Sequence, residues 1–255
     1  MARILITGTS TGIGRAAAIE LARRGHDVVA TARRPETLVG LPAAERLALD
    51  VTDQASVDAA ISAAGDIDVL VSNAGETIRG TVEATPISEY QRLYDINFLG
   101  ALRVTKAVLP AFRARGGGQF IFVSSVLGRL VIPLISGYAA SKFALEALAE
   151  TLAIEAAPFG VHVTSIQPGQ VATPGPGKAS VWNDDHEAYA PIWQAITRRG
   201  TNDRIQPEEV ATTIAELVEN PNPPLRLAVG RAAIRQLEAH RAAPDDQPFS
   251  YLTAS

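Results

Sequence analysis

Short, continuous apolar runs alternate along the chain with longer segments in which apolar residues recur at helical spacing. The runs predict strands at Arg3–Ile6, Asp27–Ala32, Arg46–Leu49, Val69–Ser72, Gln119–Val123, His162–Gln167 and Arg226–Val229. The periodic segments predict helices at Ile13–Arg24, Ser56–Ala64, Ser88–Arg115, Tyr138–Ala157 and Pro207–Glu219. Apolar strands separated by helices are typical of a parallel sheet covered on both faces. Right-handed crossovers then give a doubly wound α/β sheet.

The same pattern predicts a single domain over residues 1–255, because no linker or internal repeat divides the chain. Residues 174–206 interrupt the alternation and hold both tryptophans and several prolines. A long irregular insertion inside a compact domain is typical of a substrate lid, which we therefore predict here. Residues 242–255 are rich in proline and aspartate and predict a flexible tail. Docking of this tail on a neighbouring subunit is the alternative.

Composition and charge argue against several classes of protein. The 23 basic and 27 acidic residues give a net charge of −4 without a long run of either sign, so we expect no nucleic-acid partner. No apolar run approaches the roughly 20 residues of a membrane span, and we expect a cytoplasmic protein. The chain has no cysteine and its histidines lack ligand spacing, so we expect no metal site. The acidic cluster at Asp184–Glu187 is interpreted as a solvated patch.

A glycine-rich turn carries the first candidate chemistry. The first strand runs into Thr7-Gly8-Thr9-Ser10-Thr11-Gly12-Ile13-Gly14, and a predicted helix follows. Glycines let the main chain approach a pyrophosphate closely, and the N–H groups at the helix start favour an anion. The spacing differs from G-x-G-x-x-G and from the P-loop. An ordinary strand-to-helix turn that needs glycine is the alternative.

Arg33 and Arg34 follow the second predicted strand, where an NAD-specific fold usually carries an acidic residue for the ribose 2′-hydroxyl. Planar guanidinium groups suit a 2′-phosphate instead. The sequence therefore favours NADP(H), with NAD(H) still possible. A solvated charge pair at the beginning of a loop is the alternative interpretation.

Tyr138 and Lys142 open an alanine-rich helix, and their i, i+4 spacing places both side chains on one face. A tyrosine with its ordinary pKa of about 10 is too weak an acid for efficient catalysis at neutral pH. A neighbouring ammonium stabilises the phenolate and lowers that pKa. Only three of the 23 basic residues are lysine, which favours a function that arginine cannot supply. An incidental pair on a helix surface is the alternative.

Together these motifs resemble the short-chain dehydrogenase/reductase family, in its compact one-domain branch with hydroxysteroid- and retinol-dehydrogenase-like members. The resemblance runs from about residue 3 to residue 230. It is carried by the glycine turn, Asn73-Ala74-Gly75, Asn97, Ser125, Tyr138-x-x-x-Lys142 and Pro168-Gly169-Gln170-Val171-Ala172-Thr173. It implies a Rossmann fold whose seven-stranded parallel sheet has the strand order 3-2-1-4-5-6-7.

The resemblance also implies a role for each matching residue. Tyr138 would be the general acid that protonates a carbonyl oxygen, or the base in reverse, and Lys142 would lower its pKa and bond the nicotinamide ribose. Ser125 would hydrogen-bond the substrate oxygen, and Asn97 would hold a water that links Lys142 to solvent. The remaining expected cofactor contacts are Gly8, Ser10, Thr11, Gly12, Ile13, Gly14, Arg33, Arg34, Asp50, Val51, Asn73, Ala74, Gly75, Pro168, Gly169, Val171 and Thr173.

The sequence therefore predicts an NADP(H)-dependent oxidoreductase that acts on the carbonyl or secondary alcohol of an apolar or alicyclic small molecule. Val126–Leu134 and the lid are the expected pocket walls. We expect a homodimer or homotetramer in which Ser88–Arg115 packs against Tyr138–Ala157 of a neighbour. One alternative is a catalytically silent dinucleotide sensor or scaffold on the same fold. Another is an epimerase or dehydratase, for which the roughly 80 residues after Thr173 are too few.

Overall fold

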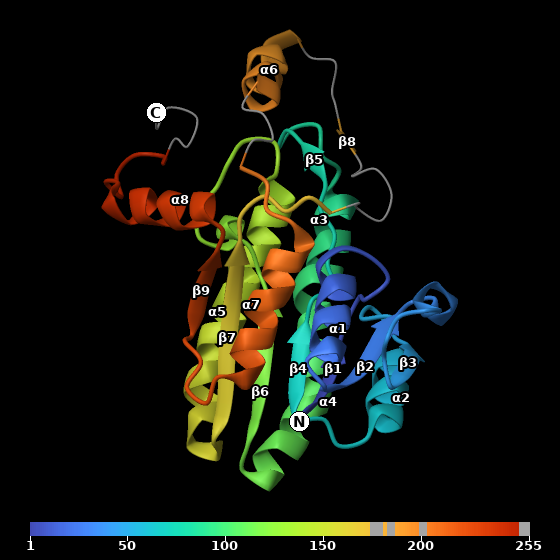
Figure 1. Cartoon of the computed structure of the whole chain (residues 1–255). Helices are drawn as coiled ribbons and strands as arrows, with labels where there is room; N and C mark the ends of the chain where they lie inside the picture. Colours follow the sequence, from blue (N-terminus) through green and yellow to red (C-terminus); the bar gives the residue numbers. More distant parts are fainter. Residues whose placement is uncertain (174–180, 183–186, 199–202, 250–255) are drawn as a thin grey trace.

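A seven-stranded parallel sheet forms the centre of the computed structural model, which describes residues 1–173, 181–182, 187–198 and 203–249 (Figure 1). Its strands are β1 (Arg3–Ile6), β2 (Asp27–Ala32), β3 (Glu45–Ala48), β4 (Val69–Ser72), β6 (Gly118–Val123), β7 (Val161–Pro168) and β9 (Arg226–Val229). They are arranged in the order β3-β2-β1-β4-β6-β7-β9. Counted within the sheet, this is the order 3-2-1-4-5-6-7, and the predicted fold class is confirmed.

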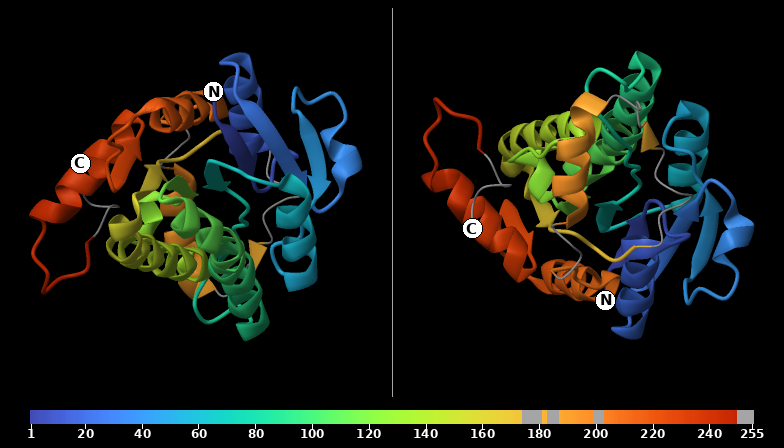
Figure 2. Two further views of the ribbon diagram at one scale, coloured as in Figure 1. Left: turned by 90° about the horizontal axis from the view of Figure 1, so that it is seen from below. Right: turned by 90° about the horizontal axis from the view of Figure 1, so that it is seen from above.

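Helices cover both faces of the sheet. Neighbouring residues of each strand point to opposite sides, and both sets are apolar, so each face needs a covering layer. In β1, Ile4 and Ile6 pack toward α1 (Gly12–Arg23) and α7 (Pro207–Glu219). Leu5 faces the other layer. That layer contains α2 (Gln54–Ala64), α4 (Gly100–Arg115) and α5 (Ser136–Ala156). Figure 2 shows the sheet between these two layers, so the strands are buried on both sides, as their continuous apolar runs predict.

The helix predicted at Ser88–Arg115 is interrupted in the structure. It consists of α3 (Ile87–Tyr94), a π-helical turn at Asp95–Leu99 and α4. A π turn inserts one residue into an otherwise continuous helix, which a search for helical periodicity does not detect. The turn contains Asn97, one of the expected site residues, and its side chain is buried.

Several further elements were not predicted. The parallel pair β5 (Arg79–Gly80) and β8 (Val181–Trp182) and helix α6 (Ala190–Arg198) lie above the carboxyl ends of the strands in Figure 1. Helix α8 (Arg231–Ala242) follows β9, and four of its six apolar residues are alanines, which gave no clear periodicity. The short helical turns are η1 (Pro35–Leu38), η3 (Val126–Gly128), η4 (Ala157–Phe159) and η5 (Glu187–Tyr189).

The predicted lid and tail fall partly outside the described residues. Outside the described residues lie 174–180, 183–186 and 199–202 of the lid and 250–255 of the tail. The described part of the tail returns to α8, where the Phe249 ring lies edge-on to His240 with 5.1 Å between the ring centroids. None of the described helices is long and apolar enough to cross a membrane.

Candidate active site

The expected site residues come together at the carboxyl edge of the sheet, around a pocket of about 580 Å³. This follows from the topology, because the loops after parallel strands all leave from the same edge. The expected residues that line the pocket are Gly8, Ser10, Thr11, Gly12, Ile13, Arg33, Asp50, Val51, Asn73, Ala74, Gly75, Ser125, Tyr138, Lys142, Pro168, Gly169, Val171 and Thr173. The structure places Gly14, Arg34 and Asn97 behind or beside this wall rather than in it.

The glycine turn forms a main-chain cradle at one end of the pocket. Gly8 and Gly12 have φ angles of 72° and 59°, in the left-handed region that favours glycine. A Cβ on Gly14 would lie 2.4 Å from the Gly8 carbonyl oxygen and 2.4 Å from Asn73 Nδ2, so this third glycine is needed for packing under the turn. Asn73 Nδ2 donates to the carbonyl oxygens of Thr7 and Gly8, which ties the end of β4 to the turn.

The cradle fits a dinucleotide. Thr11 caps α1 at its N-terminus with extended backbone, and the Thr11, Gly12 and Ile13 main chain borders the pocket. The free N–H groups and the positive end of the helix dipole are therefore directed toward the space that a pyrophosphate would occupy. A Cβ on Gly12 would reach 3.0 Å from Thr173, so a side chain there would fill the gap between this turn and the loop after β7.

Arg33 and Asp50 border the pocket beyond the glycine turn, at the ends of β2 and β3. Burial raises the pKa of Asp50, but hydrogen bonds from the Thr52 N–H and hydroxyl outweigh it and lower that pKa. The Arg33 guanidinium is 62% exposed and lies 3.4 Å from Glu76. Arg34 is exposed beside the loop, where its carbonyl oxygen accepts bonds from Thr37, so the structure brings only one of the two predicted arginines to the pocket.

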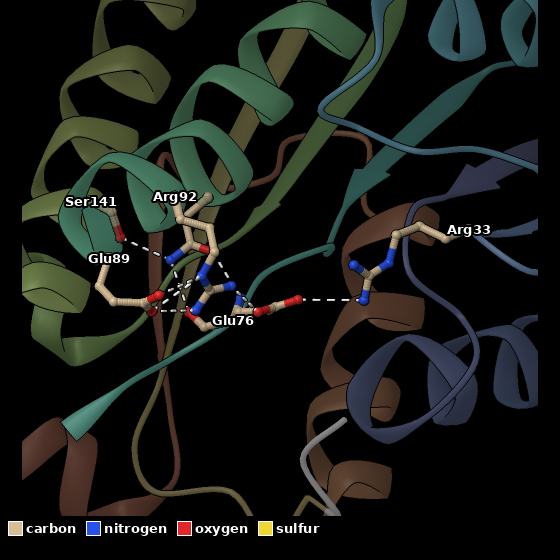
Figure 3. Close-up of polar contacts among 6 residues, drawn as sticks. Arg33, Glu76, Glu89, Arg92 and Ser141 are labelled. Carbon is tan, nitrogen blue, oxygen red and sulfur yellow. Dashed lines mark hydrogen bonds and ion pairs between the residues drawn. The ribbon is translucent and has the colours of Figure 1, made fainter. Parts of the chain in front are cut away.

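Asn97 holds the loop after β4 in place. Its Oδ1 accepts from the Glu76 N–H at 2.8 Å, and its Nδ2 donates to the Glu76 carbonyl and to Ser141 Oγ, both at 2.9 Å (Figure 3). The Glu76 carboxylate pairs with Arg92, which also contacts Glu89. These three bonds join the Asn97 amide to the main chain of Glu76 and to Ser141. That Asn97 holds a water linked to Lys142 stays a prediction. Glu76 was not among the expected site residues, although it directly follows Asn73-Ala74-Gly75.

Tyr138 and Ser125 face the pocket from α5 and from the loop after β6. Burial of the phenol raises the pKa of Tyr138 to about 12, and a hydrogen bond with Ser125 opposes this shift. The Ser125 hydroxyl also accepts from the Leu127 N–H at 3.1 Å, which fixes its position at the start of η3. Tyr138 is therefore held as a protonated phenol at neutral pH, next to a hydroxyl that can share a bond with a substrate oxygen.

Lys142 lies one turn after Tyr138 and is buried. Its Nζ donates to the Val123 carbonyl oxygen at 2.8 Å and lies 5.6 Å from the centre of the Tyr138 ring. Burial lowers the pKa of Lys142 to about 8, and the Glu146 carboxylate opposes that shift. In this structure burial of the phenol dominates the pKa of Tyr138, and the ammonium is bonded to the end of β6. The lowering of the Tyr138 pKa by Lys142 stays a prediction.

The loop after β6 and helix α6 contribute apolar side chains to the pocket. Of the expected wall Val126–Leu134, the structure places Val126, Leu127 and Ile132 at the pocket. Ile196 of α6 also lines it, from within the predicted lid. Sequence reasoning missed Arg79 of β5 and two residues of α8, Ala232 and Gln236. The four-residue spacing of this last pair places both on one helix face, but the helix itself gave no signal.

With this geometry in place, comparison with known proteins identifies the family. A model of the family described as short chain dehydrogenase matches residues 2–184. The 3-ketodihydrosphingosine reductase of Bacteroides thetaiotaomicron is 36% identical over 89% of this chain and 87% of its own. Human retinol dehydrogenase 8 is 35% identical over 88% of this chain and 79% of its own. The chain belongs to the short-chain dehydrogenase family.

Solved structures agree with this assignment. A short-chain dehydrogenase from Streptomyces avermitilis is 37% identical, with a TM-score of 0.85 over 95% of this chain and 94% of its own. A short-chain dehydrogenase from Burkholderia cenocepacia in complex with NADP is 25% identical, with a TM-score of 0.79 over 94% and 93%. A 3-ketoacyl-(acyl-carrier-protein) reductase from Brucella melitensis with NADH is 26% identical, with a TM-score of 0.74 over 89% and 96%. The protein is a dinucleotide-dependent oxidoreductase.

Proposed function

We propose that the protein is an NADP(H)-dependent oxidoreductase that interconverts a carbonyl and a secondary alcohol on an apolar or alicyclic small molecule. One observation carries the proposal: Tyr138, Ser125 and Lys142 line the same pocket as the glycine cradle. An acid, a hydroxyl donor and a cation thus stand beside the site that fits a dinucleotide.

The chain's own residues account for the proton chemistry. Tyr138 donates its phenolic proton to the substrate carbonyl oxygen, and the Ser125 hydroxyl donates a hydrogen bond to the same atom. Lys142 places a positive charge near the phenolate that results and so stabilises it. The bound nicotinamide supplies or accepts the hydride. The phenol is protonated at neutral pH, the state from which it donates. Burial raises its pKa to about 12, so proton transfer requires the Lys142 cation beside the phenolate to oppose that shift.

Arg33 supports the preference for NADP(H). Arg33 lies at the pocket margin beyond β2, and its contact with Glu76 at 3.4 Å is long; the Arg33 side chain is 62% exposed and that of Glu76 is 23% exposed. A 2′-phosphate offers the same guanidinium shorter, charge-assisted hydrogen bonds. The neighbours named with NADP and with NADH lie within the same range of identity, so the preference is proposed from Arg33.

The pocket wall supports the substrate class. Val126, Leu127, Ile132 and Ile196 give apolar surface to a lining that also includes Arg79, Asp203 and Gln236, and apolar walls bind apolar groups by removing them from water. The names of the two curated relatives, a keto-compound reductase and a retinol dehydrogenase, agree with a carbonyl or alcohol as the reacting group.

The test compares Tyr138→Phe with Tyr90→Phe. The Tyr90 hydroxyl bonds Ser136 at the start of α5, so this control removes a partly buried hydroxyl that does not line the pocket. The first step is a screen of the wild-type protein with NADPH and a panel of apolar ketones. We expect Tyr138→Phe to lower turnover on an accepted ketone by about 100-fold or more. Its affinity for NADPH, followed by fluorescence titration, is expected to stay within about 3-fold, because the phenol contributes mainly to proton transfer.

Two results would contradict the proposal. Turnover of Tyr138→Phe within tenfold of wild type, with Tyr90→Phe unchanged, would remove Tyr138 from the proton transfer. Saturable NADPH binding by the wild-type protein without turnover of any ketone or alcohol in the panel would favour the silent sensor instead.

A homodimer or homotetramer is also proposed. Phe143 and Ile154 of α5 are 42% and 73% exposed. Large apolar side chains on one exposed helix suit a contact between subunits. Light scattering of the purified protein checks this proposal.

A further inference from the structure

A second polar cluster lies behind the proposed active site and is not used in the proton transfer described above. Glu146 sits one helical turn after Lys142 on α5, on the side that faces the sheet, and only 4% of its surface is exposed. A buried carboxylate is costly unless it is paired and hydrogen-bonded, so its position calls for a physical reason.

The Glu146 carboxylate has a partner on each oxygen. Ser165 of β7 donates to Oε1 at 2.6 Å, and Arg226 of β9 donates from Nε to Oε2 at 2.9 Å. The same guanidinium reaches Glu150, one turn further along α5, at 2.6 Å. Charges of alternating sign therefore lead from Glu150 at the surface through Arg226 and Glu146 to Lys142 at the pocket.

Packing holds Glu146 close to the catalytic loop. A Cβ on Gly128 would lie 2.8 Å from Glu146 Cγ, 2.9 Å from Ser124 Oγ and 3.0 Å from the Lys142 carbonyl oxygen. The loop that follows β6 and carries Ser125 is thus pressed against α5 between Lys142 and Glu146. A displacement of Glu146 would therefore disturb both the loop that carries Ser125 and the helix that carries Lys142.

We propose that Glu146 is a positioning residue that keeps the Lys142 side chain protonated and directed to the end of β6, where the reaction takes place. The proposal rests on the proposed function, since it assigns Lys142 to the site. In a buried place an ammonium tends to lose its proton, and a nearby carboxylate opposes that loss. Arg226 has the opposite effect on the pKa of Lys142, because it is a second cation near the Glu146 carboxylate.

The series of charges from Glu150 to Lys142 has few other charged or titratable neighbours among the described residues. Among the described residues, Arg129 acts electrostatically on Glu150, and Tyr138 is the titratable neighbour of Lys142 on its own helix. Ser125, Ser165 and Asn97 are uncharged. The charges that bear on Lys142 through Glu146 are therefore those of Arg226 and, at the surface, Glu150.

The test compares the directions in which two variants shift the alkaline limb of the pH–rate profile. Glu146→Gln keeps the shape of the side chain and removes its charge, so the alkaline limb of the reduction rate, which we assign to Lys142, is expected to move to lower pH by about one unit. Arg226→Met removes the opposing cation, so the same limb is expected to move to higher pH. Glu150→Gln is the matched control: it removes a partner of the same arginine at an exposed position and is expected to shift the limb by less than about 0.3 units.

A structural role for Glu146 alone predicts something different. Glu146→Gln and Arg226→Met would then both lower stability and activity, with no shift of the alkaline limb or with shifts in the same direction. Either result would overturn the proposal.

A second readout does not depend on catalysis. The free energy of unfolding of wild type, Glu146→Gln, Lys142→Met and the double variant is measured from pH 7 to pH 10.5. If Glu146 acts on Lys142, the pH-dependent part of its effect disappears in the Lys142→Met background. If that dependence persists there, the link between the two residues is absent. Coupling here without turnover of any substrate would contradict the proposed function and leave this inference standing.

Discussion

Two ionic clusters flank the pocket, and they differ mainly in exposure. The outer cluster consists of Arg33, Glu76, Arg92 and Glu89, whose side chains are between 18% (Glu89) and 62% (Arg33) exposed. The inner cluster consists of Lys142, Glu146, Ser165 and Arg226, in which Lys142 and Glu146 are each 4% exposed. The outer cluster meets the cofactor end of the pocket and the inner one lies behind the proposed proton donor.

This difference in exposure assigns different tasks to the two clusters. An exposed ion pair contributes about 0–1 kcal/mol and is weakened by salt, so its members can exchange partners at little cost. A buried charge is costly to transfer from water and responds strongly to its neighbours. The outer cluster therefore suits ligand recognition, and the inner cluster suits control of protonation. The predictions below test this contrast.

The largest effect is expected for Lys142→Met. Turnover is expected to fall by about 100-fold or more, because the cation near Tyr138 is lost. Stability is expected to rise at pH 7 by about 1–3 kcal/mol, since burial lowers the pKa of Lys142 from 10.5 to about 8 and the folded wild type carries the cost of that buried ammonium. Denaturant unfolding at several pH values checks this.

The stability gain of Lys142→Met is expected to decrease as the pH rises. Below pH 8, Lys142 is charged in both the folded and the unfolded chain, and the full cost is present. Between pH 8 and 10.5 the folded chain has released the proton that the unfolded chain still binds, so wild-type stability rises relative to the variant and the gain fades. Lys106→Met, at an exposed lysine, is the control and is expected to show neither effect. A variant that is destabilised equally at all pH values would contradict this account.

Much of the candidate active site could be predicted from the sequence, because many of its features are local. Tyr138 and Lys142 are one helical turn apart, and the glycine turn follows its strand directly. The parallel topology then brings Ser125 and Asn73 to the same edge of the sheet. This part of the site could be predicted from the spacing of residues along the chain and from the rule that parallel strands end at the same edge of the sheet.

The parts that were missed depend on contacts between distant segments. Glu146 is joined to Arg226 across 80 positions in the chain, which no periodicity reveals. The π turn that places Asn97 is a single inserted residue. The upward effect of burial on the pKa of Tyr138 was missed too, because the sequence specifies the neighbouring lysine but not how far the phenol is enclosed. An acid four residues after Lys142, on a face otherwise rich in alanine and leucine, was the available signal for Glu146.

A smaller effect is expected at the outer cluster for Arg33→Ala. Affinity for NADPH is expected to fall by about 10-fold or more, through loss of charge-assisted hydrogen bonds to the 2′-phosphate, while affinity for NADH changes little. Arg34→Ala is the matched control, because the structure places Arg34 beside the pocket rather than in its wall. Fluorescence titration with both cofactors measures these changes. Equal losses for NADPH and NADH, or a larger loss in Arg34→Ala, would contradict the assignment of Arg33 to the phosphate.

The smallest effect is expected for Glu76→Gln. The carboxylate competes with a 2′-phosphate for Arg33, so its removal is expected to tighten NADPH binding by less than about 3-fold, and the gain is expected to vanish at about 0.5 M salt. The fold of the loop is expected to persist, because Asn97 holds the main chain of Glu76 rather than its side chain. Glu89→Gln, which removes the other carboxylate on Arg92, is the control and is expected to leave NADPH binding unchanged. A change in NADPH affinity of 10-fold or more that salt does not weaken would mean that Glu76 behaves like the buried Glu146, and the contrast between the two clusters would then not follow from exposure.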